Sequence, residues 1–96
     1  MITLIARLKA KPGKEALLAE ECVKLAKHVR ENEQGCLMYI PHVSTENPAE
    51  IIFVEKYTDQ EAFNAHGQTP YFKAYKENSA ELIDGNSQLQ FMKELI

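Results

Sequence analysis

Hydrophobic and polar residues alternate along the first ten residues of the chain. The apolar residues on one side of this pattern are Ile2, Leu4, Ala6 and Leu8. A period of two residues is typical of a β-strand that buries one face. Pro12 and Gly13 follow, and this pair predicts a turn at the end of the strand.

After the turn the period changes to that of an amphipathic helix. From about Lys14 onward, apolar residues recur at steps of four, three and four, at Leu18, Cys22, Leu25 and Val29. Charged residues fill the outer face, as expected for a helix with one buried stripe. The pattern fades over residues 31–35, where we expect Gly35 to end the helix in the left-handed conformation.

Residues 36–43 and 51–58 have the composition of two further strands. Pro41 cannot donate a hydrogen bond to a neighbouring strand, so the first of them is expected at a sheet edge, or bulged at Pro41. The second alternates, and one of its faces carries Ile51, Phe53, Glu55 and Tyr57. The polar residues between the two segments predict a loop.

The segment after residue 58 predicts a broken helix and a last strand. Thr58 and Glu61 have the spacing of a capping box, and the helix that they begin is expected to break at Gly67. Thr69 followed by Pro70 predicts a new helix start, with the helix passing Tyr75 and fading near residue 83. A turn at residues 85–86 precedes a strand over 87–95, whose apolar residues on one side are Leu89, Phe91 and Leu95.

The predicted order is β-α-β-β-α-β, which indicates an α+β, ferredoxin-like fold with a four-stranded antiparallel sheet. The 96 residues, 45% of them hydrophobic, fit one domain over 1–96. Both helices should cover one face of the sheet. Because the strands carry apolar residues on both of their faces, we expect a second copy of the sheet to cover the other face, giving a homodimer.

Charge and composition exclude several classes of protein. The formal net charge is -3 and the basic residues form no cluster, which argues against a nucleic-acid partner. No signal peptide or membrane-spanning run is visible, so the sequence predicts a cytoplasmic protein without a membrane partner. Cys22 and Cys36 have neither the spacing of a redox pair nor that of a metal site, and we expect both to be reduced, unreactive thiols.

Few residues in the sequence could carry out chemistry. No phosphate-binding glycine loop, nucleophile elbow or histidine–carboxylate metal pattern is present, so no metal is expected. If the face of the third strand that carries Glu55 and Tyr57 lies under the helices, desolvation should raise the pKa of Glu55. The alternative is a Glu55 at the rim, paired with a lysine, beside a Tyr57 that only fills the core.

His66 and the residues after it form the second candidate group. A histidine titrates near neutrality and suits proton transfer, although His66 could instead only cap the carbonyl groups of its helix. Thr69 and the free amides after Pro70 form a helix N-terminus that could bind an oxyanion or phosphate. The aromatic rings nearby could form flat walls for a ligand, but they could equally be core or dimer packing: Tyr71, Phe72 and Tyr75.

The segments NEQGCLMY and VEKYTDQEAFNAHGQTPYFKAY resemble the antibiotic biosynthesis monooxygenase superfamily of small dimeric ferredoxin-like proteins. The resemblance covers nearly the whole chain and is most specific from Glu55 to Lys73. Within the superfamily, the His-x-x-Thr-Pro step is similar to that of bacterial quinol monooxygenases and of isomerases that act on a phosphorylated autoinducer-2 breakdown product. The resemblance implies a dimeric α+β barrel and a pocket between each protomer's sheet and helices. The pocket positions that it implies are Tyr57, Phe63, His66 and Tyr71, with Glu55 beside them.

The chain departs from the haem-degrading members of this superfamily. Lys76 stands where those enzymes carry the haem-ligating histidine. Ala6 replaces their first-strand asparagine, and Tyr57 replaces a tryptophan. These departures argue against haem, and no cofactor is expected.

The resemblance implies a cofactor-independent monooxygenase that oxidises a quinol or a similar small aromatic substrate with O₂. His66 would be the base, and Glu55 would orient it or share its proton. The residues that would bind the substrate and exclude water are Tyr57, Phe63, Thr69, Tyr71 and Phe72. Two alternatives stay open: an isomerase of a small phosphorylated keto compound, with the phosphate at Thr69, and a dimeric ligand-binding module without catalytic activity.

Overall fold

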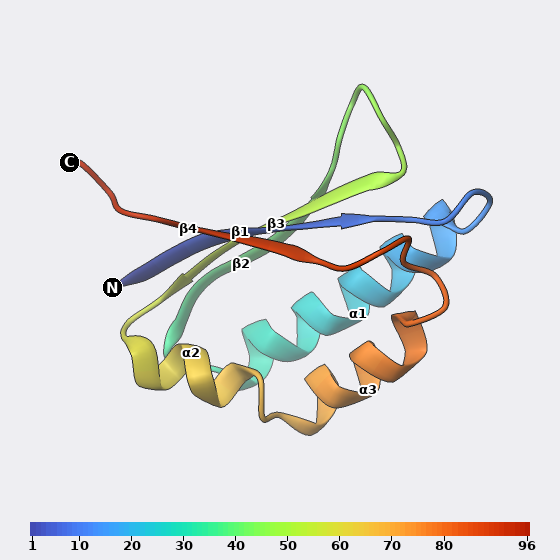
Figure 1. Ribbon diagram of the computed structural model, residues 1–96. Helices are drawn as coiled ribbons and strands as arrows, with labels where there is room; N and C mark the ends of the chain where they lie inside the picture. The colour runs from blue at the N-terminus through green and yellow to red at the C-terminus, as the bar shows by residue number, and fades with distance from the viewer.

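Four strands and three helices make up the computed structural model, which describes residues 1–96 (Figure 1). In chain order they are β1 (Ile2–Lys9), α1 (Glu15–Asn32), β2 (Cys36–Val43), β3 (Glu50–Tyr57), α2 (Gln60–His66), α3 (Pro70–Ser79) and β4 (Gln88–Met92). The order confirms the predicted ferredoxin-like arrangement, with the second helix divided into α2 and α3. None of the helices combines the length and the apolar character that crossing a membrane requires.

The sheet is antiparallel, and its strands lie in the order β2-β3-β1-β4. β2 is therefore an edge strand, as the proline predicted. The bulge that the pattern allowed at Pro41 lies instead between Cys36 and Met38. β4 forms the other edge and pairs with β1 only from Thr3 to Arg7, so Leu95 lies beyond the sheet and is exposed, contrary to the expected strand.

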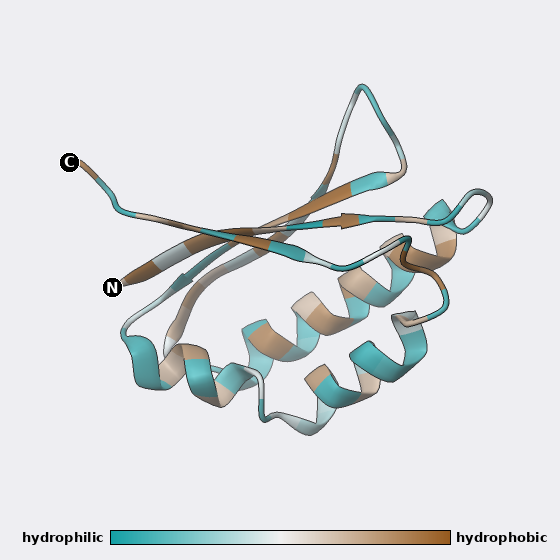
Figure 2. Cartoon of the chain, viewed as in Figure 1, coloured by the Kyte–Doolittle hydropathy of each residue, from teal (hydrophilic) through white to brown (hydrophobic).

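All three helices lie on one side of the sheet (Figure 1). Hydrophobic residues run along the central strands and in stripes along the helices, with hydrophilic residues between them (Figure 2). The predicted stripe of α1 is buried against the sheet, and it contains Leu18, Cys22, Leu25, Ala26 and Val29. On β1 and β3 the residues of the predicted inner parity are buried, apart from the partly exposed Ile2, because the alternating period places them under the helices.

Two predicted helix ends differ from the structure. Asp59, not Thr58, caps α2, and its side chain accepts a hydrogen bond from the amide of Ala62 at 2.8 Å. Thr58 is held instead by a backbone hydrogen bond just beyond the ends of β2 and β3, because its amide donates to the carbonyl of Gly35. The left-handed cap expected at Gly35 is also absent, since only Gly13 and Gly85 have positive φ.

Gly35 is required for a different reason, its close approach to α2. A Cβ atom at this position would lie 2.7 Å from Cβ of Ala62 and 3.3 Å from Oγ1 of Thr58. The missing side chain lets the segment after α1 pack directly against α2. This contact brings the end of α1 beside the helix that carries His66.

The outer face of the sheet has no helix over it. The register places Ile5, Val54 and Ile40 side by side in one row across β1, β3 and β2 on this face. All three are partly exposed. The expectation that a second copy covers this face stays a prediction.

Candidate active site

A cavity of about 710 Å³ lies between the sheet and the helices α2 and α3. Its volume is in the range of small-molecule sites. Every strand contributes to its walls, and β4 supplies Leu89, which is paired with Ala6 on the inner face of the sheet. The apolar part of the lining includes Leu4, Ala6, Leu8, Phe53, Phe63 and Phe72. Glu55 and His66 line the same cavity.

The break between α2 and α3 places His66 at the wall of this cavity. His66 is the last residue of α2, and its carbonyl accepts a hydrogen bond of 2.9 Å from the hydroxyl of Thr69. The same hydroxyl oxygen accepts from the amide of Phe72, so Thr69 caps α3 as predicted. The predicted start at Thr69-Pro70 is thereby confirmed, and it ties the start of α3 to the end of α2.

His66 is only 5% exposed, and three aromatic rings surround its imidazole. Their centroids lie 4.7 Å (Phe72), 5.0 Å (Tyr39) and 5.7 Å (Tyr57) from the centroid of the imidazole. These contacts limit how far the ring can turn. The ring is therefore held in one orientation rather than being free at the surface.

Glu33, not Glu55, is the hydrogen-bond partner of His66. Both carboxylate oxygens of Glu33 lie 3.1 Å from Nδ1 of the imidazole. An ionised carboxylate only accepts, so this contact matches the tautomer of His66 that carries its proton on Nδ1. The other nitrogen, Nε2, has no hydrogen-bond partner, and no fully buried side-chain nitrogen or oxygen is left unpaired. Nε2 is therefore accessible from the cavity that the ring lines.

Glu55 lies on the inner face of β3 and is 5% exposed. Its only hydrogen bond from the chain comes from the hydroxyl of Tyr57, at 2.7 Å. Burial raises the pKa of Glu55 above its ordinary value of 4.5, while the hydrogen bond from Tyr57 and the nearby His66 oppose the rise. This position agrees with the expectation of a desolvated carboxyl group and not with the alternative of a surface pair with lysine.

The four tyrosines at or near the cavity are all protonated. Burial raises the pKa of each of them above the ordinary value of 10, in Tyr39, Tyr57, Tyr71 and Tyr75. Their hydroxyl groups can therefore donate hydrogen bonds but cannot act as phenolate bases near neutral pH. Among the groups that line the cavity, His66 is the one with a ring nitrogen that has no hydrogen-bond partner in the chain.

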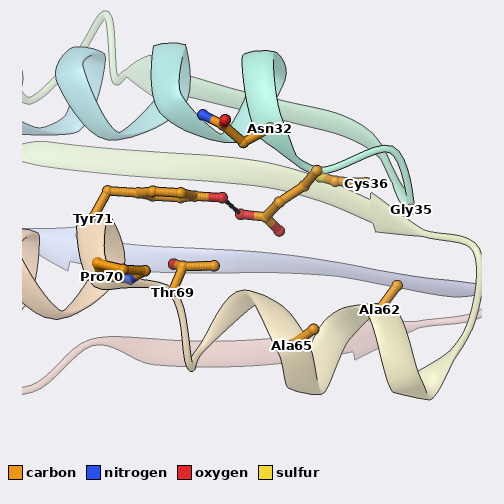
Figure 3. A pocket seen from close by; sticks show the side chains of 9 residues that line it. Asn32, Gly35, Cys36, Ala62, Ala65, Thr69, Pro70 and Tyr71 are labelled. Carbon is orange, nitrogen blue, oxygen red and sulfur yellow. Dashed lines mark hydrogen bonds between the residues drawn. The ribbon is translucent and has the colours of Figure 1, made fainter.

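A second, smaller hollow of about 500 Å³ is lined by Glu33 but not by His66, and Figure 3 shows it from close by. Figure 3 shows Tyr71 and Asn32 on one side of it, and Ala62 and Ala65 of α2 on the other. The hydroxyl of Tyr71 donates to Glu33, the interaction drawn in the figure. The ring of Tyr71 stacks on His28 at a centroid distance of 5.3 Å.

The predicted site residues are thus divided between two hollows. Phe63 and Phe72 line the large cavity with Glu55 and His66. Thr69 and Tyr71 line the small hollow. Tyr57 lines neither, because it is completely buried and its hydroxyl is turned to Glu55.

Two residues of the site were missed by the sequence interpretation. Tyr39 lies opposite Glu55 in the register of β2 and β3 and contacts the ring of His66. The alternation of inward and outward side chains along β2 could have indicated that Tyr39 points inward. Glu33 follows the end of α1 among other charged residues. Nothing in its local sequence distinguishes it, because its partner is 33 residues away.

Other groups that could bind a metal or react are not assembled at this site. No three His, Cys, Asp or Glu side chains lie where they could hold a metal ion. Cys22 and Cys36 are free thiols, as expected. Burial raises the pKa of Cys22 to about 12 and that of Cys36 to about 11, so both are unreactive near neutral pH.

Comparisons with known proteins agree with this fold. The family model described as antibiotic biosynthesis monooxygenase matches residues 1–78. Over 88 residues the chain is 32% identical to the probable quinol monooxygenase YgiN of Escherichia coli, covering 80% of this chain and 83% of that protein. The crystal structure of PA3566 from Pseudomonas aeruginosa has a TM-score of 0.92 at 27% identity and covers 99% of this chain and 94% of that one.

A third relative is longer than this chain. The uncharacterised protein sll1783 of Synechocystis is 27% identical over 95 residues, and the match spans 96% of this chain but 62% of sll1783. The family match and the relatives named as monooxygenases support a monooxygenase activity. The chain belongs to the antibiotic biosynthesis monooxygenase family.

Proposed function

We propose that this protein is a cofactor-independent monooxygenase that oxidises a quinol or a similar small aromatic substrate with O₂. His66 is the general base, and its Nε2 atom takes the phenolic proton. The observation that carries the proposal is the accessible Nε2 atom of an otherwise enclosed histidine at the wall of a largely apolar cavity. The name of the Escherichia coli relative favours a quinol as the substrate.

The chemistry asks little of the protein beyond a base and a dry cavity. The phenolate that remains after proton loss gives one electron to O₂, which forms a semiquinone radical and superoxide. The two radicals join in a carbon–oxygen bond, the peroxide anion takes back the proton held by His66, and the resulting hydroperoxide loses water. One oxygen atom of O₂ then lies in the hydroxyquinone and the other in water. Apolar walls protect the radical pair and the hydroperoxide from side reactions with solvent.

Glu55 has a different role in this proposal from that of His66. Burial raises the pKa of Glu55, so the neutral carboxylic acid, which can donate a hydrogen bond, is more accessible than in an exposed glutamate. Oε1 accepts from Tyr57, whereas Oε2 has no hydrogen-bond partner in the chain, and Glu55 lines the cavity. We infer that Glu55 donates to an oxygen of the substrate, such as the developing quinone carbonyl.

The cavity and the pairing of Glu55 argue against a ligand-binding module without activity. In such a module we would expect a filled cavity and a Glu55 bound to a surface lysine. The cavity is open beside His66, and Glu55 is bonded to Tyr57 instead. These two observations favour an enzyme.

Oxygen consumption with a panel of reduced quinols tests the proposal, after the rate of autoxidation is subtracted. We expect uptake that depends on the enzyme, and a loss of about 10²–10⁴-fold in His66→Ala, as is usual when a general base is removed. His42→Ala is the matched control, because His42 is an exposed histidine on the opposite face of the sheet. It should keep the wild-type rate.

Two results would contradict the proposal. A change of less than about threefold in His66→Ala would exclude His66 as the base. An absence of uptake across the whole panel would exclude the quinol reaction. In that case the protein would be assayed for proton transfer on a phosphorylated keto compound. Inhibition of this reaction by inorganic phosphate would favour the isomerase, with phosphate bound at the start of α3.

A further inference from the structure

The pair formed by Glu33 and His66 lies between two separate hollows. His66 lines the large cavity and not the small hollow, whereas Glu33 lines the small hollow and not the large cavity. The side chain of His66 is 6% exposed and that of Glu33 is 13% exposed. The two sides of the imidazole therefore face different spaces.

The small hollow has access to solvent. Residues at its mouth are exposed, among them Asn32, Ala65 and Pro70. Its inner wall is Glu33, which accepts hydrogen bonds from Nδ1 of His66 and from the hydroxyl of Tyr71. Two donors on one carboxylate satisfy the ionised form and fix its position.

We propose that Glu33 is the positioning residue for His66, and that the small hollow is a port through which a small carboxylate can reach the same position beside Nδ1. Glu33 holds the proton on Nδ1 and so keeps the lone pair of Nε2 toward the large cavity. When Nε2 takes a proton, the carboxylate of Glu33 balances the new positive charge in a site that excludes water. The catalytic part of this inference rests on the proposed function, in which His66 is the base.

Both roles of Glu33, holding the proton on Nδ1 and balancing the charge, follow from its position beside the imidazole. An imidazole with no partner at Nδ1 is free to move its proton to Nε2, and it then presents a donor to the substrate where an acceptor is required. A charge that appears inside an apolar site is costly unless a counter-charge lies within hydrogen-bond distance. Glu33 is the only acidic side chain bonded to His66, at 3.1 Å.

Nitrogen NMR of the histidine side chains tests the tautomer without any substrate. In the wild-type protein, with His66 neutral, we expect Nδ1 to carry the proton and Nε2 to have none. In Glu33→Ala we expect a mixture in which Nε2 carries the proton in a large share of the molecules. A wild-type His66 protonated at Nε2 would overturn the inference even if the quinol reaction is confirmed.

Chemical rescue tests the port. Glu33→Ala should lower kcat by about 10²-fold or more with little change in KM, because a histidine base in the wrong tautomer cannot take the proton. Sodium formate should restore a large part of the lost kcat, while sodium chloride at the same ionic strength should not. Glu31→Ala is the matched control, since Glu31 is an exposed residue in the last turn of α1, two residues before Glu33, and formate should not affect it.

The outcomes separate the two proposals. If Glu33→Ala keeps the wild-type kcat, the positioning role of Glu33 is wrong. If kcat falls and formate does not restore it, the small hollow is not a port. If Glu33→Ala does not fold, as circular dichroism would show, the size-matched Glu33→Gln and the wild-type tautomer decide the question. If the wild-type protein has no activity but His66 shows the Nδ1 tautomer, the proposed function fails and the positioning by Glu33 stands.

Discussion

The hydroxyl of Tyr57 donates a 2.7 Å hydrogen bond to Oε1 of Glu55, two residues earlier on the same face of β3. Tyr57 is completely buried and Glu55 is 5% exposed. Residues i and i+2 of a strand lie side by side, so the pairing follows from the alternation of β3. This buried carboxyl group with one donor links the stability of the fold to pH.

We expect the stability contributed by Glu55 to decrease as the pH rises. Burial raises the pKa of Glu55 in the folded protein above its ordinary value of 4.5. Between the two pKa values the folded protein holds a proton that the unfolded chain has lost, so the free energy of unfolding falls with increasing pH. The contribution is complete below the ordinary pKa of 4.5 and is lost as the pH rises through the raised pKa of the folded protein. Urea unfolding at about pH 4, 6 and 8 measures it.

Glu55→Gln is the comparison for this measurement. The amide cannot ionise, so the variant should lose this part of the pH dependence and should gain stability relative to the wild type as the pH increases. The other charged groups that face Glu55 are His66 and Glu33, and both remain in the variant. An equal pH dependence in the two proteins would show that Glu55 ionises without cost.

Tyr57→Phe should raise the pKa of Glu55 further. The hydrogen bond from Tyr57 stabilises the ionised carboxylate and lowers the pKa, opposing the effect of burial. Carbon NMR of the Glu55 carboxyl group, followed through a pH titration, measures the change. Tyr39→Phe is the control, because Tyr39 lies opposite Glu55 but gives it no hydrogen bond. A lower or unchanged pKa in Tyr57→Phe would contradict the assignment.

Gly35→Ala should destabilise the protein, while Gly67→Ala should not. The new Cβ at position 35 would lie 2.7 Å from Cβ of Ala62, and overpacking of this kind costs about 1–3 kcal/mol. At position 67 the nearest atom is the carbonyl oxygen of Asn64 at 3.7 Å, and the backbone is already helical with φ -68°. There alanine should be neutral or stabilise by up to about 1 kcal/mol. Urea unfolding of both variants distinguishes the two sites, and equal effects would contradict the close approach of Gly35.

We propose that the outer face of the sheet forms a homodimer. Ile5, Val54 and Ile40 form an apolar row there, and no helix covers them. Size-exclusion chromatography with light scattering should give twice the protomer mass of 10.9 kDa at micromolar concentration. Val54→Lys should shift the protein to monomer, because a charge buried in the centre of an interface is unfavourable. Leu17→Lys, a substitution of an exposed residue of α1 on the helical side, should leave the mass unchanged. A wild-type monomer would exclude this dimer.

The elements of the fold could be predicted because their signals are local. The alternation in residues 2–9 and the stripe from Leu18 to Val29 each report which side of an element is apolar, whatever packs against it. Thr69 and Pro70 likewise specify a helix start through contacts within three residues. The errors at Thr58 and Gly35 arose where a contact distant in sequence competed with a local signal. Pairing with Gly35 holds Thr58, and packing against Ala62 explains the glycine.

The sequence by itself determined the strands, the helices, their order, and that His66 lies at a break between two helices. Only the tertiary structure decided that Glu33 rather than Glu55 holds His66, and that the candidate residues line two hollows instead of one. The physical reason is the distance along the sequence over which each kind of signal acts. A periodic pattern reports the environment of each residue over a few neighbours, whereas a hydrogen bond between residues 33 and 66 depends on how α1, α2 and the sheet pack together.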